Sequence, residues 1–70
     1  MLSVGNLVEE KNDLEVKVAR LEIFTTSSQY KSLSYAEQHL LLRQKEAMQN
    51  YLNILRARVS LYQDFTSVPL

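Results

Sequence analysis

The stretch that decides the fold is SYAEQHLLLRQKEAMQNYLNILRARVSLYQDF, residues 34–65. It begins with a capping box, because the Ser34 hydroxyl can accept from the Glu37 amide while the Glu37 side chain reaches back to the Ser34 amide. No glycine or proline follows before Pro69. The stretch therefore predicts one helix over about residues 35–65, which would be roughly 45 Å long at about 1.5 Å per residue.

The preceding residues predict a shorter helix over about residues 4–25, where Leu7, Leu14 and Leu21 recur every seven residues. Asn6 and Glu9 could form a capping box that starts the stable helix at Leu7 and leaves Gly5 outside it. We therefore expect an all-α antiparallel helical hairpin, about 30 Å long in its first arm.

The connection between the two predicted helices is rich in hydroxyl side chains. Residues 25–28 are Thr-Thr-Ser-Ser, and such side chains end helices by competing for backbone hydrogen bonds. Residues 29–33 then predict one short helical turn, in which Tyr30 and Leu33 would plug the open end of the hairpin. The chain is expected to be a single domain over residues 1–70, with residues 66–70 as a loose tail.

Composition excludes several classes of protein. The 70 residues carry eight Lys plus Arg and eight Asp plus Glu, one histidine (His39) and no cysteine, so neither a disulfide nor a metal site is expected and DNA or RNA binding is not indicated. No apolar run is long enough to span a membrane, and no secretory signal is present, so the cytoplasm is expected. No nucleophile–base pair or glycine-rich phosphate loop is present, which indicates a non-enzyme without a cofactor.

The second predicted helix has more apolar surface than one partner helix can cover. In heptads with Leu41, Leu55 and Tyr62 at position a, the apolar positions g, a and e span about 160° at 100° per residue. A 70-residue core rarely supplies more than about 3–5 kcal/mol. Both observations favour assembly into a homo-oligomeric helical bundle. We expect its interface to contain Met48, Leu55, Val59, Leu61, Tyr62 and Phe65, the last four overhanging the end of the first helix.

A row of polar residues runs through this apolar surface at the d positions of the same helix, Glu37, Gln44, Tyr51 and Arg58. Two interpretations stay open. The row could fix the register and number of associating helices, as buried polar residues do in coiled coils. Alternatively, it could line a ligand pocket between protomers, where Tyr51 stacks on a ring and Arg58 and Arg56 hold a phosphate or carboxylate, with Gln44 beside them.

One segment also carries a resemblance. The run from Tyr30 to Gln44 (YKSLSYAEQHLLLRQ), continued by Ala47-Met48, Tyr51, Ile54-Leu55 and Arg58-Val59, resembles small phage proteins related to a gene product of crAss-like phages. The resemblance covers about residues 7–60. It implies a phage or prophage accessory protein in the cytoplasm of a bacterial host.

Two functional hypotheses follow from these features. The first is a counter-defence sponge, a homo-oligomer that sequesters an anionic nucleotide signal of host immunity without catalysis. The second is an inhibitor or adaptor that docks on a host protein through the apolar end of the long helix. The architecture supports the first hypothesis only by analogy with other small oligomeric phage proteins.

Overall fold

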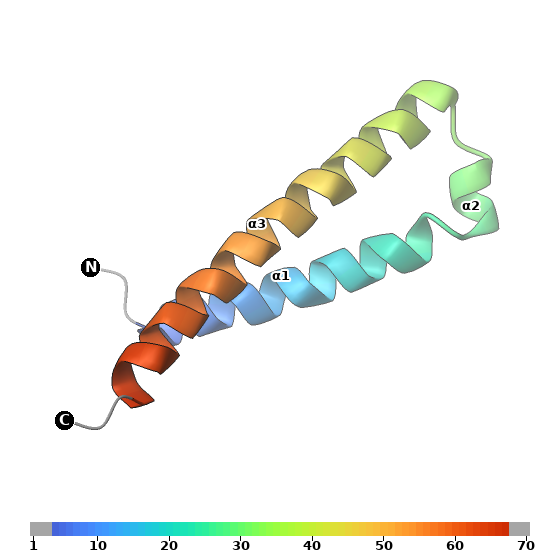
Figure 1. Cartoon of the computed structure of the whole chain (residues 1–70). Coiled ribbons are helices and arrows are strands. Elements are labelled where there is room, and N and C mark those ends of the chain that lie inside the picture. The colour runs from blue at the N-terminus through green and yellow to red at the C-terminus, as the bar shows by residue number, and fades with distance from the viewer. Residues whose placement is uncertain (1–3, 68–70) are drawn as a thin grey trace.

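The computed structural model describes residues 4–67 of the chain, with side chains described for residues 5–62. Its elements are helices α1 (Val4–Phe24), α2 (Ser28–Lys31) and α3 (Tyr35–Ser67). Figure 1 shows that α1 and α3 run antiparallel, close together near the chain ends and further apart where α2 joins them. The predicted all-α hairpin is therefore confirmed for the described residues. The long helix continues two residues beyond its predicted end, into the expected tail, whose residues 68–70 lie outside the described part.

Side-chain caps set the boundaries of α2 and α3. The Glu37 amide donates to the Ser34 hydroxyl at 3.2 Å, which confirms this half of the predicted box at the start of α3. In the same way, the Tyr30 amide donates to the Ser27 hydroxyl at 3.2 Å and starts α2. Helix α1 begins at Val4, which confirms the predicted range of about residues 4–25. The suggested start at Leu7 was wrong, because Gly5 lies inside the helix rather than before it.

Hydroxyl groups end α1 as the sequence predicts. Thr25, Thr26 and Ser27 each donate a side-chain hydrogen bond to the carbonyl three residues earlier, at 2.9, 2.8 and 2.6 Å. These bonds occupy carbonyls that the last turn of a helix leaves without partners. The chain can therefore leave α1 and turn toward α2.

Tyr30 closes the wide end of the hairpin. Its side chain is buried, and its ring meets the Phe24 ring edge to face, with centroids 6.3 Å apart. The Tyr30 hydroxyl donates to the Gln38 carbonyl at 3.2 Å, which ties α2 to the first turn of α3. Tyr30 thus occupies the position that the sequence predicts for a plug.

The core lies in the narrow half of the hairpin. Six buried side chains form it: Leu7, Leu14 and Val18 from α1, with Leu52, Leu55 and Val59 from α3. The predicted register of the two helices was wrong, because Val59 packs in this core instead of overhanging α1. The reason is the length that α2 adds. The first turns of α3 pack beside Tyr30, which shifts the later turns of α3 along α1.

The hairpin is long and thin for its size. Its radius of gyration is 16.1 Å and its extents are 57 × 20 × 15 Å, whereas a compact domain of this length has a radius of gyration of about 11 Å. A shape of this kind leaves large apolar side chains at the surface. Those of α3 include Leu40, Ile54 and Leu61, which are 62%, 56% and 69% exposed.

Candidate functional site

Two open grooves flank the packed seam between α1 and α3. The first, here called the acidic groove, brings Tyr51 of α3 beside Glu9, Glu10, Asp13 and Lys17 of α1. The second, here called the amide groove, is lined by Gln49, Asn50, Asn53 and Arg56 of α3 and by Glu15 and Glu22 of α1. Tyr51 and Arg56 are five residues apart, so they point about 140° apart around α3. The two residues proposed for one site thus belong to different grooves.

Tyr51 is the best-defined side chain of the acidic groove. Its hydroxyl donates to the Glu10 carboxylate across the helix pair, and its side chain remains 44% exposed. The pKa of the Tyr51 hydroxyl is raised, first because it donates to Glu10 and second because it is partly desolvated, while the positive charge of Arg58 acts in the opposite direction. Arg58 therefore lies within electrostatic reach of Tyr51 on α3, as their seven-residue spacing predicts.

The Tyr51–Glu10 contact predicts a measurable titration. Because the hydrogen bond to a carboxylate favours the neutral phenol, Glu10→Gln should lower the pKa of Tyr51 toward its ordinary value of about 10. A raised pKa in the folded state stabilises the fold below the unfolded pKa, and this contribution is lost as pH rises through the folded pKa. Ultraviolet difference titration, with Tyr51→Phe to assign the signal, measures the shift.

Glu9→Gln is the matched control for this titration. Glu9 lines the same groove, but Glu10 is the carboxylate that accepts the bond from Tyr51. The control should leave the tyrosine titration close to that of the unmodified chain. Equal titration curves for the unmodified chain and the Glu10→Gln variant would contradict the assignment of the shift to this hydrogen bond.

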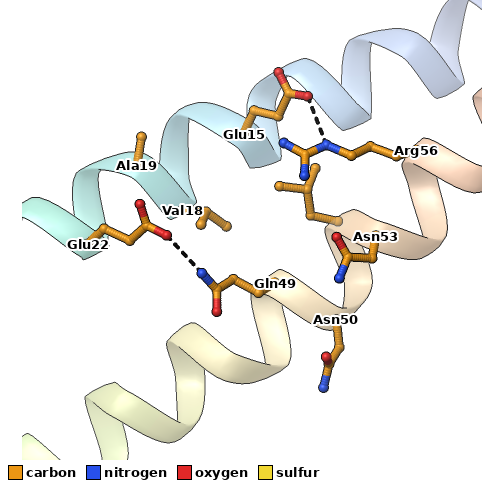
Figure 2. Close-up of a pocket in the computed structure, with 9 residues that line it drawn as sticks. Glu15, Val18, Ala19, Glu22, Gln49, Asn50, Asn53 and Arg56 are labelled. Carbon is orange, nitrogen blue, oxygen red and sulfur yellow. Dashed lines mark hydrogen bonds and ion pairs between the residues drawn. The ribbon is translucent and has the colours of Figure 1, made fainter.

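In the amide groove, Arg56 of α3 pairs with Glu15 of α1 in a partly exposed contact. Figure 2 shows the Arg56 side chain directed at Glu15. The Arg56 Nε atom lies 3.3 Å from the Glu15 Oε1 atom. The pKa of Glu15 is lowered, chiefly by a hydrogen bond from Lys11 and further by Arg56, while partial desolvation opposes both. Lys11 thus pairs with Glu15 on its own helix, 3.4 Å from the Oε1 atom. Arg56 is a helix-pairing residue in the hairpin, so the ligand role that the sequence suggests for it has less support.

The amide groove also holds residues that the sequence analysis did not single out. Gln49 Nε2 donates to Glu22 Oε1 at 2.8 Å across the helices, and Asn50 and Asn53 line the same groove. Carboxamides both donate and accept, so they can pair with the edge of a nucleobase. The sequence does contain a pattern that could have indicated them, because Gln49, Asn50 and Asn53 fall within five positions of one predicted helix.

Gln44 lies apart from Tyr51 within one chain. Its Nε2 atom is 3.8 Å from the Met48 sulfur, and it borders a mainly apolar hollow with Leu33, Glu37 and Leu40 at the wide end. Seven residues of helix separate it from Tyr51, which is about 10 Å. A single hairpin therefore places Gln44, Tyr51 and Arg58 along one line of α3 without gathering them around one pocket.

Two of the predicted interface residues are unavailable to a second chain. Leu55 is fully buried and Val59 nearly so, both inside the hairpin, and Met48 packs partly buried against the same core. Leu61 and Tyr62 are exposed, while the side chain of Phe65 lies outside the described set. Within residues 4–67, no helix has the length and hydropathy to cross a membrane, and no group of three acidic, histidine or cysteine side chains could hold a metal ion.

Comparison with known proteins identifies the family. The family profile named Sequestin matches residues 4–61, which include α1, α2 and most of α3. The chain belongs to the Sequestin family. The match contains both grooves and the line of Gln44, Tyr51 and Arg58, and the family name supports a sequestering role in general. No curated protein and no solved structure is significantly similar to the chain.

Proposed function

We propose that this Sequestin is a phage counter-defence protein, a non-catalytic homo-oligomer in the bacterial host's cytoplasm that binds and sequesters a small anionic nucleotide signal of host immunity. The observation that carries the proposal is the Sequestin match over residues 4–61. It covers the whole described hairpin except the last turns of α3. A sequestering protein needs affinity for its ligand and no chemistry, which agrees with a surface built of stacking and hydrogen-bonding groups.

The residues proposed for binding are Tyr51, Arg58 and Gln44. The Tyr51 ring is partly exposed and offers a flat face to a nucleobase, while a guanidinium such as that of Arg58 binds phosphate in a bidentate manner. Gln44 can donate to and accept from the edge of a base. Arg56 is left out of this set because it lines the amide groove, where it pairs with Glu15, and not the surface that contains Tyr51.

Charge determines the side from which the ligand approaches Tyr51. Glu9, Glu10 and Asp13 border Tyr51 on its α1 side, and carboxylates there would repel a phosphate. Arg58 lies about two turns further along the same line of α3 and is not among the residues that line the acidic groove. We therefore place the phosphate beside Arg58, on the surface of α3 that α1 leaves uncovered, where a second protomer can close the site.

Isothermal titration calorimetry against cyclic ADP-ribose, ADP-ribose, cyclic di-AMP and AMP tests the proposal. We expect one of the signalling nucleotides to bind in the micromolar range or tighter, with AMP much weaker. Bound nucleotide released by heating should be chemically unchanged, because the proposed role involves no catalysis. If no nucleotide of the panel binds while the oligomer is intact, the proposal is wrong.

The second candidate is an adaptor for a host protein, and one observation favours it. Leu61 and Tyr62 are 69% and 45% exposed near the end of α3, where an apolar helix face could enter a groove on a partner. The same calorimetry separates the two candidates, because an adaptor that docks through an apolar helix face is not expected to bind any nucleotide of the panel.

A further inference from the structure

The described part of α3 carries an exposed apolar row on the side that α1 does not cover. Leu40, Ala47, Ile54 and Leu61 recur every seven residues, and all four are exposed. The residues of α3 that pack against α1 are others, namely Leu52, Leu55 and Val59. One helix thus presents two separate apolar faces, of which only one is covered within the chain.

The exposed row alternates with the polar line in a coiled-coil pattern. From Leu40 to Gln44 is four residues, from Gln44 to Ala47 is three, and the 4–3 alternation continues through Tyr51, Ile54 and Arg58 to Leu61. Such a spacing, kept over three heptads, is typical of a helix that packs along its length on another helix. We call this surface of α3, from Leu40 to Leu61, the outer seam. Between these residues it is about 32 Å long.

We propose that the outer seam binds the outer seam of a second copy of the chain in the antiparallel direction, with Tyr51 at the two-fold axis. In this register Ile54 of one copy and Ala47 of the other are offset by one residue, about 1.5 Å along the axis, so a large side chain meets a small one. Leu61 meets Leu40 with the same small offset. Arg58 lies directly opposite Gln44, whose amide oxygen can accept from the guanidinium. A two-fold interface repeats each of these pairs twice.

The parallel direction is disfavoured by the same residues. It would place Arg58 against Arg58, two like charges facing each other at an interface, which is costly. It would also place Ala47 against Ala47 and Ile54 against Ile54, alternating a void with a crowded layer. A second copy in the antiparallel direction avoids both problems.

The pairing also bears on the proposed ligand site. This part of the inference rests on the proposed function, because it takes Tyr51, Arg58 and Gln44 as the binding residues. Within one chain, Gln44 and Arg58 are fourteen residues apart on α3, which is about 21 Å, but the Gln44 of a second copy lies directly opposite Arg58. Each complete site then consists of Tyr51 and Arg58 of one copy and Gln44 of the other. The site is incomplete in a single hairpin, and the two-fold axis creates two such sites per pair.

Disulfide cross-linking tests the pairing directly, because the chain has no cysteine of its own. Ala47→Cys and Ile54→Cys chains, mixed in equal amounts and oxidised, should form a cross-linked dimer. Each variant alone should not, because in the antiparallel register two equivalent residues are about 10 Å apart along the helix, beyond disulfide reach. Glu46→Cys mixed with Ser60→Cys, both exposed positions of α3 facing away from the seam, is the control and should stay uncross-linked.

A mass measurement by light scattering completes the test. Ile54→Lys should convert the assembly to species of half its mass or less, with the helix content kept because Ile54 is 56% exposed in the hairpin. Glu46→Lys should leave the mass unchanged. Cross-linking of either single variant by itself, absence of cross-links in the mixture, or a monomeric unmodified chain would overturn the proposal. These results do not depend on nucleotide, so they are separate from the outcome of the calorimetry.

Discussion

Replacing Leu55 with alanine should leave a large fraction of the chain unfolded at 25 °C. Leu55 is fully buried, at 0% exposure, in the small cluster that holds α1 against α3. A buried leucine-to-alanine change costs about 2–5 kcal/mol, and a core of this size supplies only about 3–5 kcal/mol. The two quantities are comparable, so the loss of one side chain should remove most of the stability of the hairpin.

Circular dichroism during urea unfolding, at one fixed chain concentration, measures this effect. The concentration has to be fixed because association would add to the apparent stability. Ile23→Ala is the matched control, since Ile23 is an aliphatic side chain of the same size that is 71% exposed on α1. It should change the free energy of unfolding by no more than about 0.5 kcal/mol. Equal midpoints for the two variants would show that the core lies elsewhere.

Local signals in the sequence predicted the elements of the fold well. Ser34 and the hydroxyl residues after Phe24 act within three or four positions of the chain, so their effects depend on local spacing alone. Tyr30 was predicted as a plug for a similar reason. A large aromatic side chain in a short turn between two helices can be buried only between the ends of those helices. All three were found in their predicted roles.

The register of the helices could not be predicted in the same way. It depends on how far the connection moves the start of α3 away from the end of α1, and heptad periodicity is nearly unchanged by a shift of one or two turns. Val59 shows the result, because it was expected to overhang α1 and instead packs in the same core cluster as Leu7. The contact of Tyr51 with Glu10 was missed for the same reason, since it joins residues that only the register brings together.

The excess of apolar surface on α3 was predicted correctly, but its division between two faces was not. The sequence shows one broad arc, whereas the structure covers the edge of this arc that contains Leu52 and Val59 and leaves the edge that contains Ile54 exposed. Between these edges lie Tyr51 and Arg58. Polar residues along the boundary of a covered and an uncovered face can contact solvent in the single chain and a partner in an assembly. The polar row could therefore do both things in one interface: fix the register of the paired helices and contact a ligand.

Arg58→Ala should weaken nucleotide binding by roughly 10- to 150-fold. A hydrogen bond to a charged group contributes about 1.5–3 kcal/mol, and each 1.4 kcal/mol corresponds to about tenfold in the dissociation constant. Arg58→Lys should recover part of the loss, because lysine keeps the charge but lacks the planar fork that holds a phosphate at two points. Calorimetry with the tightest-binding nucleotide of the panel measures all three proteins.

Arg56→Ala is the decisive control, because it removes the same type of residue only two positions away. Arg56 points into the other groove and pairs with Glu15 at 3.3 Å, a largely exposed contact of the kind that contributes little to stability. Its loss should leave affinity within about twofold. Light scattering on both variants separates a lost phosphate contact from a weakened outer seam, because only the latter lowers the mass. An affinity loss for Arg56→Ala as large as that for Arg58→Ala, at unchanged mass, would move the ligand to the amide groove, which Asn50 and Asn53 line together with Arg56.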